Sequence, residues 1–312
     1  MRSDLYPIAG KIPIMGEAAS VWLTPGRSGK VLAAVNHATY LLTDLGELIW
    51  LASAQSPMHR RCIRWPMPLP NLAVETTFVV RGCSIDMASG IKLDLHSSVM
   101  REAPNVTVKE VIELGELPNL LFAVVEAFLS QESPLGFGVF IRPVFQIARK
   151  EELDPGFPPE DTLTRNAWKA VEKIARACLH QDLPEMLKEA EPLTGLGQGL
   201  TPDGDDFLGG LFFGRYLLLC AFPNLFRMQL SRLHEWLDVN QPRTNLISFT
   251  LLKDNVAGHA LEPLNRMGIA LLTNQPVEDV TSAAAELVKV GHSTGWSLLA
   301  GFVTGMLMAY PD

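Results

Sequence analysis

The segment from Thr194 to Gly210, TGLGQGLTPDGDDFLGG, combines glycines, hydroxyls and acids in a pattern that can bind an anion. Its alternating glycines free the backbone for positive φ, so that neighbouring N–H groups can converge on a phosphate or carboxylate. Thr201 followed by Pro202 predicts a helix start with Thr201 at the N-cap, and a helix N-terminus attracts negative charge. Gly197, Gly199 and Thr201 are therefore candidate substrate-binding residues.

Three aspartates, Asp203, Asp205 and Asp206, stand in the first turn of this predicted helix. They can complement the helix dipole, which is worth about 0.3–1 kcal/mol for each acid. Alternatively, Asp205 and Asp206 are catalytic residues that orient an amide N–H or hold a hard cation such as Mg²⁺ against substrate oxygens. Capping needs one acid, so we favour a functional site here, but we favour the dipole interpretation over a metal.

A second polar segment, GHSTGW at residues 291–296, precedes a C-terminal apolar run. Its G-x-S-x-G spacing matches a nucleophile elbow, but a helix-like stretch precedes it and no histidine follows Ser293, which disfavours a serine hydrolase. Ser293 or Thr294 can instead cap the last helix, and both are candidate substrate-binding residues. His292 either packs in the core or faces the site, where it would act as a catalytic residue that moves a proton.

Polar residues also recur between Thr244 and Glu262 in an otherwise apolar stretch. Thr244 and Ser248 are one helical turn apart, so they share a helix face. Such a stripe either faces solvent, with hydroxyls bonded back to the helix carbonyls, or lines a pocket. We favour the solvated interpretation, and in the alternative Ser248 is a further candidate substrate-binding residue.

Small residues predict that two of these segments meet. Gly210 and Gly214 lie one and two turns beyond Asp206 on one helix face, and Gly301 and Gly305 repeat the same spacing near the C-terminus. Close packing of these two helices would bring their starts together, with both contributing polar groups to one site.

The secondary structure that must position these segments is predicted to change along the chain, from mainly strands to mainly helices. Up to about residue 150, short apolar or alternating runs predict strands, among them ASVWLT at 19–24 and FGVFIRPV at 137–144, with a helix at 118–129 packed on the sheet. Beyond a Pro-rich stretch the spacing is helical. Helices are expected from about residue 163 and then at 182–190, 203–221, 224–238, 243–258, 276–290 and 293–309.

We therefore expect a fold of the α+β class. A β-rich domain, barrel-like or sandwich, spans residues 1–150, a linker spans 151–162, and a mostly α-helical domain spans 163–312. The small substrate is expected near the junction of the two domains.

Composition excludes several classes of function. The net charge is −8 and no basic stripe is present, which disfavours nucleic-acid binding. The four cysteines form no C-x-x-C pair, and the N-terminus lacks the apolar run of a signal peptide, so we expect a cytoplasmic protein. The apolar stretches 207–222 and 296–310 are shorter than the roughly 20 residues of a membrane span, so no membrane partner is expected.

The runs GLGQGLTPDGDDFLGG and GHSTGWSLLAG together resemble a bacterial family catalogued as a domain of unknown function, which includes the AllH-like subunit of oxamate carbamoyltransferase. The resemblance implies carbamoyl transfer among oxalurate, phosphate, oxamate and carbamoyl phosphate in allantoin degradation. It also implies FdrA-like and other transferase subunits as partners. Asp203 stands where this family usually carries a small hydroxyl residue and Ser297 where an acid is frequent, which implies a changed substrate or a shifted carboxylate.

The expected function is binding of a small carboxylate or phosphate by a subunit of a carbamoyltransferase that acts on oxamate or oxalurate-type ureido acids. One alternative is a non-catalytic assembly or metabolite-sensing subunit. Another is a stand-alone amidohydrolase-like enzyme, which would need an activated water that no metal-ligand spacing in the sequence supports.

Overall fold

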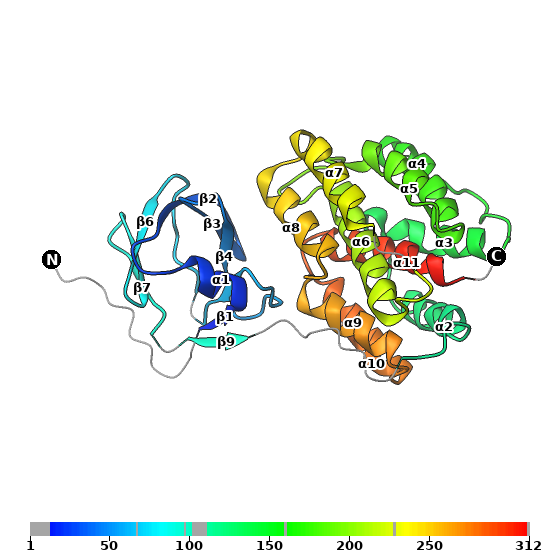
Figure 1. The fold of residues 1–312 in the computed structure, drawn as a ribbon, viewed down its shortest axis with the longest axis horizontal. Helices are drawn as coiled ribbons and strands as arrows, with labels where there is room; N and C mark the ends of the chain where they lie inside the picture. Colours follow the sequence, from blue (N-terminus) through cyan, green and yellow to red (C-terminus); the bar gives the residue numbers. More distant parts are fainter. Residues whose placement is uncertain are drawn as a thin grey trace. The chain divides into compact units, whose positions relative to one another are not determined.

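The computed structural model describes residues 13–66, 68–96, 98–101, 111–158, 161–226 and 229–310. The chain divides into two compact units, Met1–Asn105 and Val106–Asp312. The first contains a β-sheet and is called the sheet unit, and the second is almost entirely helical and is called the helical unit (Figure 1). This arrangement confirms the predicted fold class, a β-rich part followed by a mostly α-helical part.

One curled sheet forms the sheet unit. Within the described residues, nine strands are hydrogen-bonded in the order β8, β7, β6, β2, β3, β4, β5, β1, β9. Most neighbours are antiparallel, whereas β4 with β5 and β1 with β9 are parallel. Because these strands all belong to one sheet, the barrel-like alternative describes the unit and the sandwich does not. The strands are β1 Ile14–Gly16, β2 Ser28–Val35, β3 Ala38–Thr43, β4 Leu48–Ala52, β5 Cys62–Arg64, β6 Thr77–Arg81, β7 Ser84–Met87, β8 Lys92–Asp94 and β9 Val99–Arg101.

Alternating apolar residues explain how the sheet buries one face. In β6, Phe78 and Val80 are buried between exposed neighbours, and they pack in one core with Leu41 of β3 and Val31 of β2. The expected strand ASVWLT is wrong, because these residues form most of helix α1, Glu17–Trp22. Its small, adjacent alanines suit a short helix against the sheet edge as well as a strand, and periodicity over six residues does not separate the two.

The helical unit surrounds two central helices, α6 (Asp203–Ala221) and α11 (Thr294–Met306) (Figure 1). The remaining α-helices are α2 Leu117–Leu129, α3 Ile141–Ala148, α4 Thr162–Leu179, α5 Leu183–Ala190, α7 Leu230–Asn240, α8 Leu246–Val256, α9 Glu262–Leu272 and α10 Val277–Leu287. Short 3-10 helices are η1 Gly136–Phe140, η2 Glu191–Leu193, η3 Gln241–Arg243 and η4 Leu307–Ala309. The predicted helices match α5 and α6 within a residue, whereas α9 was not predicted, because Pro263 and Gly268 interrupt its apolar pattern.

The stretch between the expected domains lies within the helical unit. The expected strand FGVFIRPV is wrong, since it forms η1 and the start of α3. In the Pro-rich segment 151–162, the ring of Phe157 packs against Trp168 of α4 at 4.7 Å and against Phe140 at 6.4 Å between ring centroids. Within the helical unit, helix α2 packs against α9 and α10. The compact units thus divide after residue 105, and residues 111–150 pack with the helices.

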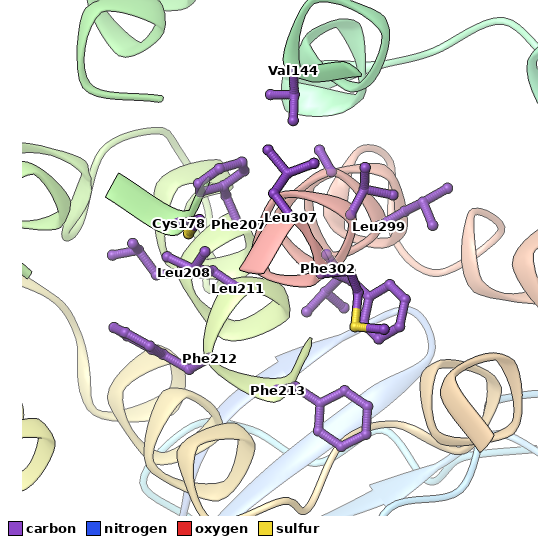
Figure 2. Packing of buried hydrophobic residues seen from close by; sticks show 14 of the residues in the cluster. Val144, Cys178, Phe207, Leu208, Leu211, Phe212, Phe213, Leu299, Phe302 and Leu307 are labelled. Atoms are coloured by element: carbon purple, nitrogen blue, oxygen red, sulfur yellow. The ribbon is translucent and has the colours of Figure 1, made fainter. Parts of the chain in front are cut away.

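Glycines bring α6 and α11 into close contact, as their spacing predicts. A Cβ atom at Gly301 would overlap the carbonyl oxygen of Phe207, and one at Gly305 would overlap that of Leu211. A Cβ at Gly210 would likewise overlap the carbonyl oxygen of Leu298. The contacts advance along both helices in the same direction, so the helices run parallel and their N-termini lie at the same end. Figure 2 shows buried apolar side chains of α6, among them Phe207 and Leu211, together with Leu299 and Phe302 of α11.

Both apolar stretches noted in the sequence lie within this core, in α6 and in α11 with η4. Within the described ranges, no helix has both the length and the apolar character needed to cross a membrane.

Candidate functional site

The candidate site lies at the joined N-termini of α6 and α11, wholly within the helical unit. Helix α6 begins at Asp203 with Pro202 at its N-cap, one residue later than predicted, which is the usual uncertainty of a helix boundary. Helix α11 begins at Thr294 with Ser293 at the N-cap, one of the two predicted positions, although the Ser293 hydroxyl does not cap the helix. The Thr201 and Thr294 hydroxyl oxygens are hydrogen-bonded at 3.0 Å. Two segments 93 residues apart are thereby joined at one point.

The glycine-rich loop passes over the start of α6. Gly195, Gly197 and Gly199 all have positive φ, of 73°, 125° and 89°, as the alternating glycines predict. A Cβ atom at Gly197 would lie 2.8 Å from the Asp203 backbone nitrogen, so a side chain there would cover the first N–H of the helix. Gly199 is exposed and has open space around it. The loop can thus approach a helix N-terminus closely without covering it with side chains.

Asp205 connects the glycine-rich loop to α8. Its Oδ1 accepts a hydrogen bond from the Gly195 backbone N–H at 2.7 Å. Its Oδ2 accepts from the Ser248 hydroxyl at 2.7 Å and from the Thr244 hydroxyl. Asp205 is 3% exposed, and both of its oxygens are used within the protein. The structure therefore gives Asp205 the geometry of a positioning residue.

Asp206 is buried between the helix starts, with 7% of its surface exposed. The hydroxyls of Thr294 and Thr201 lie close enough to its carboxyl group to influence its pKa, while Oδ2 has no hydrogen-bond partner among the described residues. Burial raises the pKa of Asp206 well above the usual aspartate range, and the hydroxyl of Thr294 opposes that shift. The nearby carboxylates of Asp203 and Asp205 raise it further. Asp206 thus retains its proton to a higher pH than an exposed aspartate, and one of its oxygens has no partner.

Asp203 is the most accessible of the three acids, since it is only partly buried. Its Oδ1 accepts a hydrogen bond from the Ser297 hydroxyl at 2.7 Å, and Ser297 accepts one from the Phe137 backbone N–H at 3.3 Å. Asp203 and Ser297, the two positions at which the resemblance implied a departure, are therefore in direct contact. Sequence reasoning did not select Asp203 as a site residue, because its partners lie 94 residues away and in another helix start.

Of the remaining predicted residues, some lie at the joined helix N-termini and one contacts Asp205. His292 is exposed on the turn before α11, which excludes the core alternative for this residue. Ser293 is partly buried beside Gly136, where a Cβ atom would lie 2.7 Å from the Cβ of Ser293. Ser248 is 2% exposed and faces Asp205, so the favoured solvated interpretation is wrong for this residue. It supports Asp205 and does not line open space.

The three aspartates do not combine with other ligating side chains. In the part of the chain that the structure describes, no group of three or more histidine, cysteine, aspartate or glutamate side chains is arranged to hold a metal ion. Asp205, one of the two residues considered for Mg²⁺, already accepts three hydrogen bonds from the protein.

The arrangement brings donors and acceptors together. Two parallel helix N-termini carry partial positive charge, which favours a negatively charged oxygen, although the Gly204 and Gly295 N–H groups already donate to the Leu196 and Val290 carbonyls. The Asp203 carboxylate at the same end is an acceptor for N–H groups. A small molecule that carries both an anionic oxygen and an amide N–H would complement both features.

One of three comparisons with known proteins gave a match. The sequence model of a family described as oxamate carbamoyltransferase subunit AllH matches residues 193–306, from the end of η2 to the end of α11. This range contains both segments of the resemblance and the residues joined at the helix starts, and it confirms an AllH-like character for this part of the chain. Searches of curated proteins and of solved structures gave no match.

Proposed function

We propose that the joined N-termini of α6 and α11 bind a small planar acid, and that the chain is a subunit of a carbamoyltransferase acting on oxamate or oxalurate-type ureido acids. The family match supports the association with a transferase subunit and with partner chains. FdrA-like and other transferase subunits would be those partners. The substrate class rests on the chemistry of the site.

The observation that carries the proposal is Asp206. A carboxyl oxygen that is buried without a partner costs free energy, of the order of 1–3 kcal/mol, and such a group is retained where function needs it. This one lies where two helix N-termini meet, beside hydroxyls that join them. A helix start alone would not identify a site, but together these features support one.

The proposed roles follow from position. Backbone N–H groups of the loop at Gly197 and Gly199, with the Thr201 and Thr294 hydroxyls, bind the oxygens of the acid and offset charge that develops during carbamoyl transfer. Asp205 holds the loop against α8. The exposed His292 exchanges a proton with the leaving or attacking group.

Thermal denaturation of the full chain tests the site. Oxamate, oxalurate, carbamoyl phosphate and inorganic phosphate are added separately, and a ligand at 100 times its dissociation constant stabilises by about 2.7 kcal/mol. We expect at least one acid to raise the melting temperature of the wild type, and this shift to be lost in Thr294→Val, which removes one hydroxyl and keeps the side-chain shape.

Thr304→Val is the matched control, because Thr304 lies on the same helix, away from the site, and its hydroxyl donates back to the Ala300 carbonyl. Retention of the ligand shift in Thr294→Val, or its loss in Thr304→Val, would contradict the proposed position. Absence of any shift in the wild type would overturn binding by this chain.

A non-catalytic assembly or sensing subunit would have the same family match. Activity separates the two: after co-purification with its partners, a His292→Ala variant that assembles and binds the acid but loses carbamoyl transfer supports a catalytic role, whereas full transfer activity supports the assembly or sensing role.

A further inference from the structure

The three aspartates at the start of α6 differ in what they can offer a ligand. Both oxygens of Asp205 accept hydrogen bonds from the protein. Asp206 is buried among the threonine hydroxyls. Asp203 is partly exposed, and within the described part of the chain no hydrogen bond is found on its Oδ2. Asp203 is therefore the carboxylate that a ligand at this end of the helices can reach.

Neighbouring groups fix the orientation of Asp203. Ser297 is fully buried, and the Phe137 N–H donates to its oxygen. The single hydroxyl proton of Ser297 is then directed to Asp203 Oδ1 at 2.7 Å. This contact holds Asp203 as a hydrogen-bond acceptor and leaves Oδ2 for another donor.

Gly136 keeps this carboxylate uncovered. Its φ is +52°, and a Cβ atom there would lie 2.7 Å from Asp203 Oδ1 and 2.7 Å from the Ser293 Cβ. Any larger residue would occupy the space beside both groups. Glycine adopts this backbone conformation readily and leaves the space beside Asp203 and Ser293 open.

Charge restricts what can bind here. Two helix N-termini attract an anionic oxygen, but a carboxylate at the same end repels a second negative charge. A ligand with one carboxylate and an adjacent amide avoids this repulsion, because its N–H group can donate to Asp203. A diacid of the same shape would place two carboxylates against each other.

We propose that Asp203 is the specificity-determining residue of the site, accepting an amide or ureido N–H of the ligand through Oδ2, so that the site selects small amide acids over diacids of equal shape. The inference rests on the proposed function, since it specifies the ligand of the same site. It also assigns the selectivity to an acid that stands outside the predicted catalytic pair.

Oxamate and oxalate provide a matched pair of probes, because they have the same planar shape and differ by an amide in place of a carboxylate. Titration calorimetry of the full chain measures both dissociation constants. We expect the wild type to bind oxamate at least about tenfold more tightly than oxalate, as expected for a charge-assisted hydrogen bond gained and a repulsion avoided. In Asp203→Asn the ratio should approach one, because the amide can both donate and accept.

Asp182→Asn is the control for net charge, since Asp182 caps α5 in the same unit and lies outside the site. It should keep the wild-type ratio. Ser297→Ala serves as a second variant that keeps the Asp203 charge and removes its orienting contact, and it should retain the direction of the preference with a smaller ratio.

The outcomes separate this inference from the proposed function. If the wild type binds both acids equally, or if Asp203→Asn leaves the ratio unchanged, the role of Asp203 is overturned while the binding site stands. If the wild type binds neither acid and none of the ureido or phosphate compounds, the proposed function fails, and the inference fails with it.

Discussion

The pair of helices α6 and α11 has two contrasting ends. Along most of their length, glycines allow backbone contact and the surrounding side chains are apolar and buried. At the N-terminal end, within one turn, acids and hydroxyls replace them, and one buried oxygen of Asp206 has no partner among the residues that the structure describes. The glycine contacts along the two helices, called the packed length, fix their relative position. The acids and hydroxyls at their N-terminal end, called the polar end, depend on this position, and burying them lowers the stability of the fold. This contrast teaches that the site depends on packing that lies outside it.

The largest expected effect comes from breaking the packed length. Gly301→Ala places a methyl group against the Phe207 carbonyl, so the two backbones must separate. We expect the free energy of unfolding to fall by about 3 kcal/mol, the upper end for overpacking, in urea denaturation. Gly115→Ala is the control, because Gly115 is exposed with open space around it, and a similar loss there would refute the packing explanation.

The next effect comes from the acid that supports the polar end. Asp205→Asn removes a charged acceptor from three hydrogen bonds, and we expect the free energy of unfolding to fall by about 2 kcal/mol. Ligand binding should weaken as well, since the loop and α8 lose their common anchor. Ser248→Ala removes one of the three bonds and should cost less. An unchanged denaturation midpoint in Asp205→Asn would show that these contacts contribute nothing net.

A pH-dependent effect sharpens the contrast at Asp206. Its folded-state pKa is raised, so its stabilising contribution is present below the unfolded-state value and is lost as pH rises through the folded-state pKa. In this window one proton difference corresponds to at most about 1.4 kcal/mol per pH unit. Denaturation midpoints of the wild type and Asp206→Asn should therefore diverge in favour of the variant as pH rises. Parallel pH profiles would contradict a raised pKa.

The smallest change in stability is expected at Ser293, whose side chain makes no capping hydrogen bond. Ser293 is at the N-cap of α11 without a capping hydrogen bond, so Ser293→Ala should change stability by less than about 0.5 kcal/mol. Asn245 caps α8 by accepting from the Ser248 N–H and donates to the Leu200 carbonyl, so Asn245→Ala should cost about 1 kcal/mol. Equal losses in thermal denaturation would remove the distinction between the two caps.

Features formed by residues close together in the sequence could be predicted, whereas contacts between residues far apart in the sequence could not. The glycine spacing, visible within one turn, predicted the α6 and α11 contact, and the loop glycines predicted positive φ. The role of Asp205 could not be predicted, because its hydroxyl partners lie 39 and 43 residues further along the chain. Asp203 was missed for the same reason, as was Gly136, whose importance depends on contacts formed only after folding.

The wrong secondary-structure predictions have a different cause. The stretch at 137–144 is apolar at nearly every position, and a short run of that kind fits a buried strand and a buried helix equally well. Tertiary packing decided between them, through Phe140 and its contacts with Phe157 and Trp168. Whether Ser248 and His292 are buried or exposed could not be predicted either, because a side chain's exposure depends on the neighbouring elements and not on its own helix alone.

The hydrogen bond between Thr201 and Thr294 also has a kinetic consequence. Contacts between residues so far apart must close a long loop, and such contacts form slowly during folding. The glycine-rich loop and the first turn of α6 are synthesised before α11, yet they gain their partner hydroxyl and the Ser297 contact only when residues 294–306 dock. During translation the nascent chain would therefore expose the apolar face of α6 until α11 is added, and the proposed site would be completed only at that step.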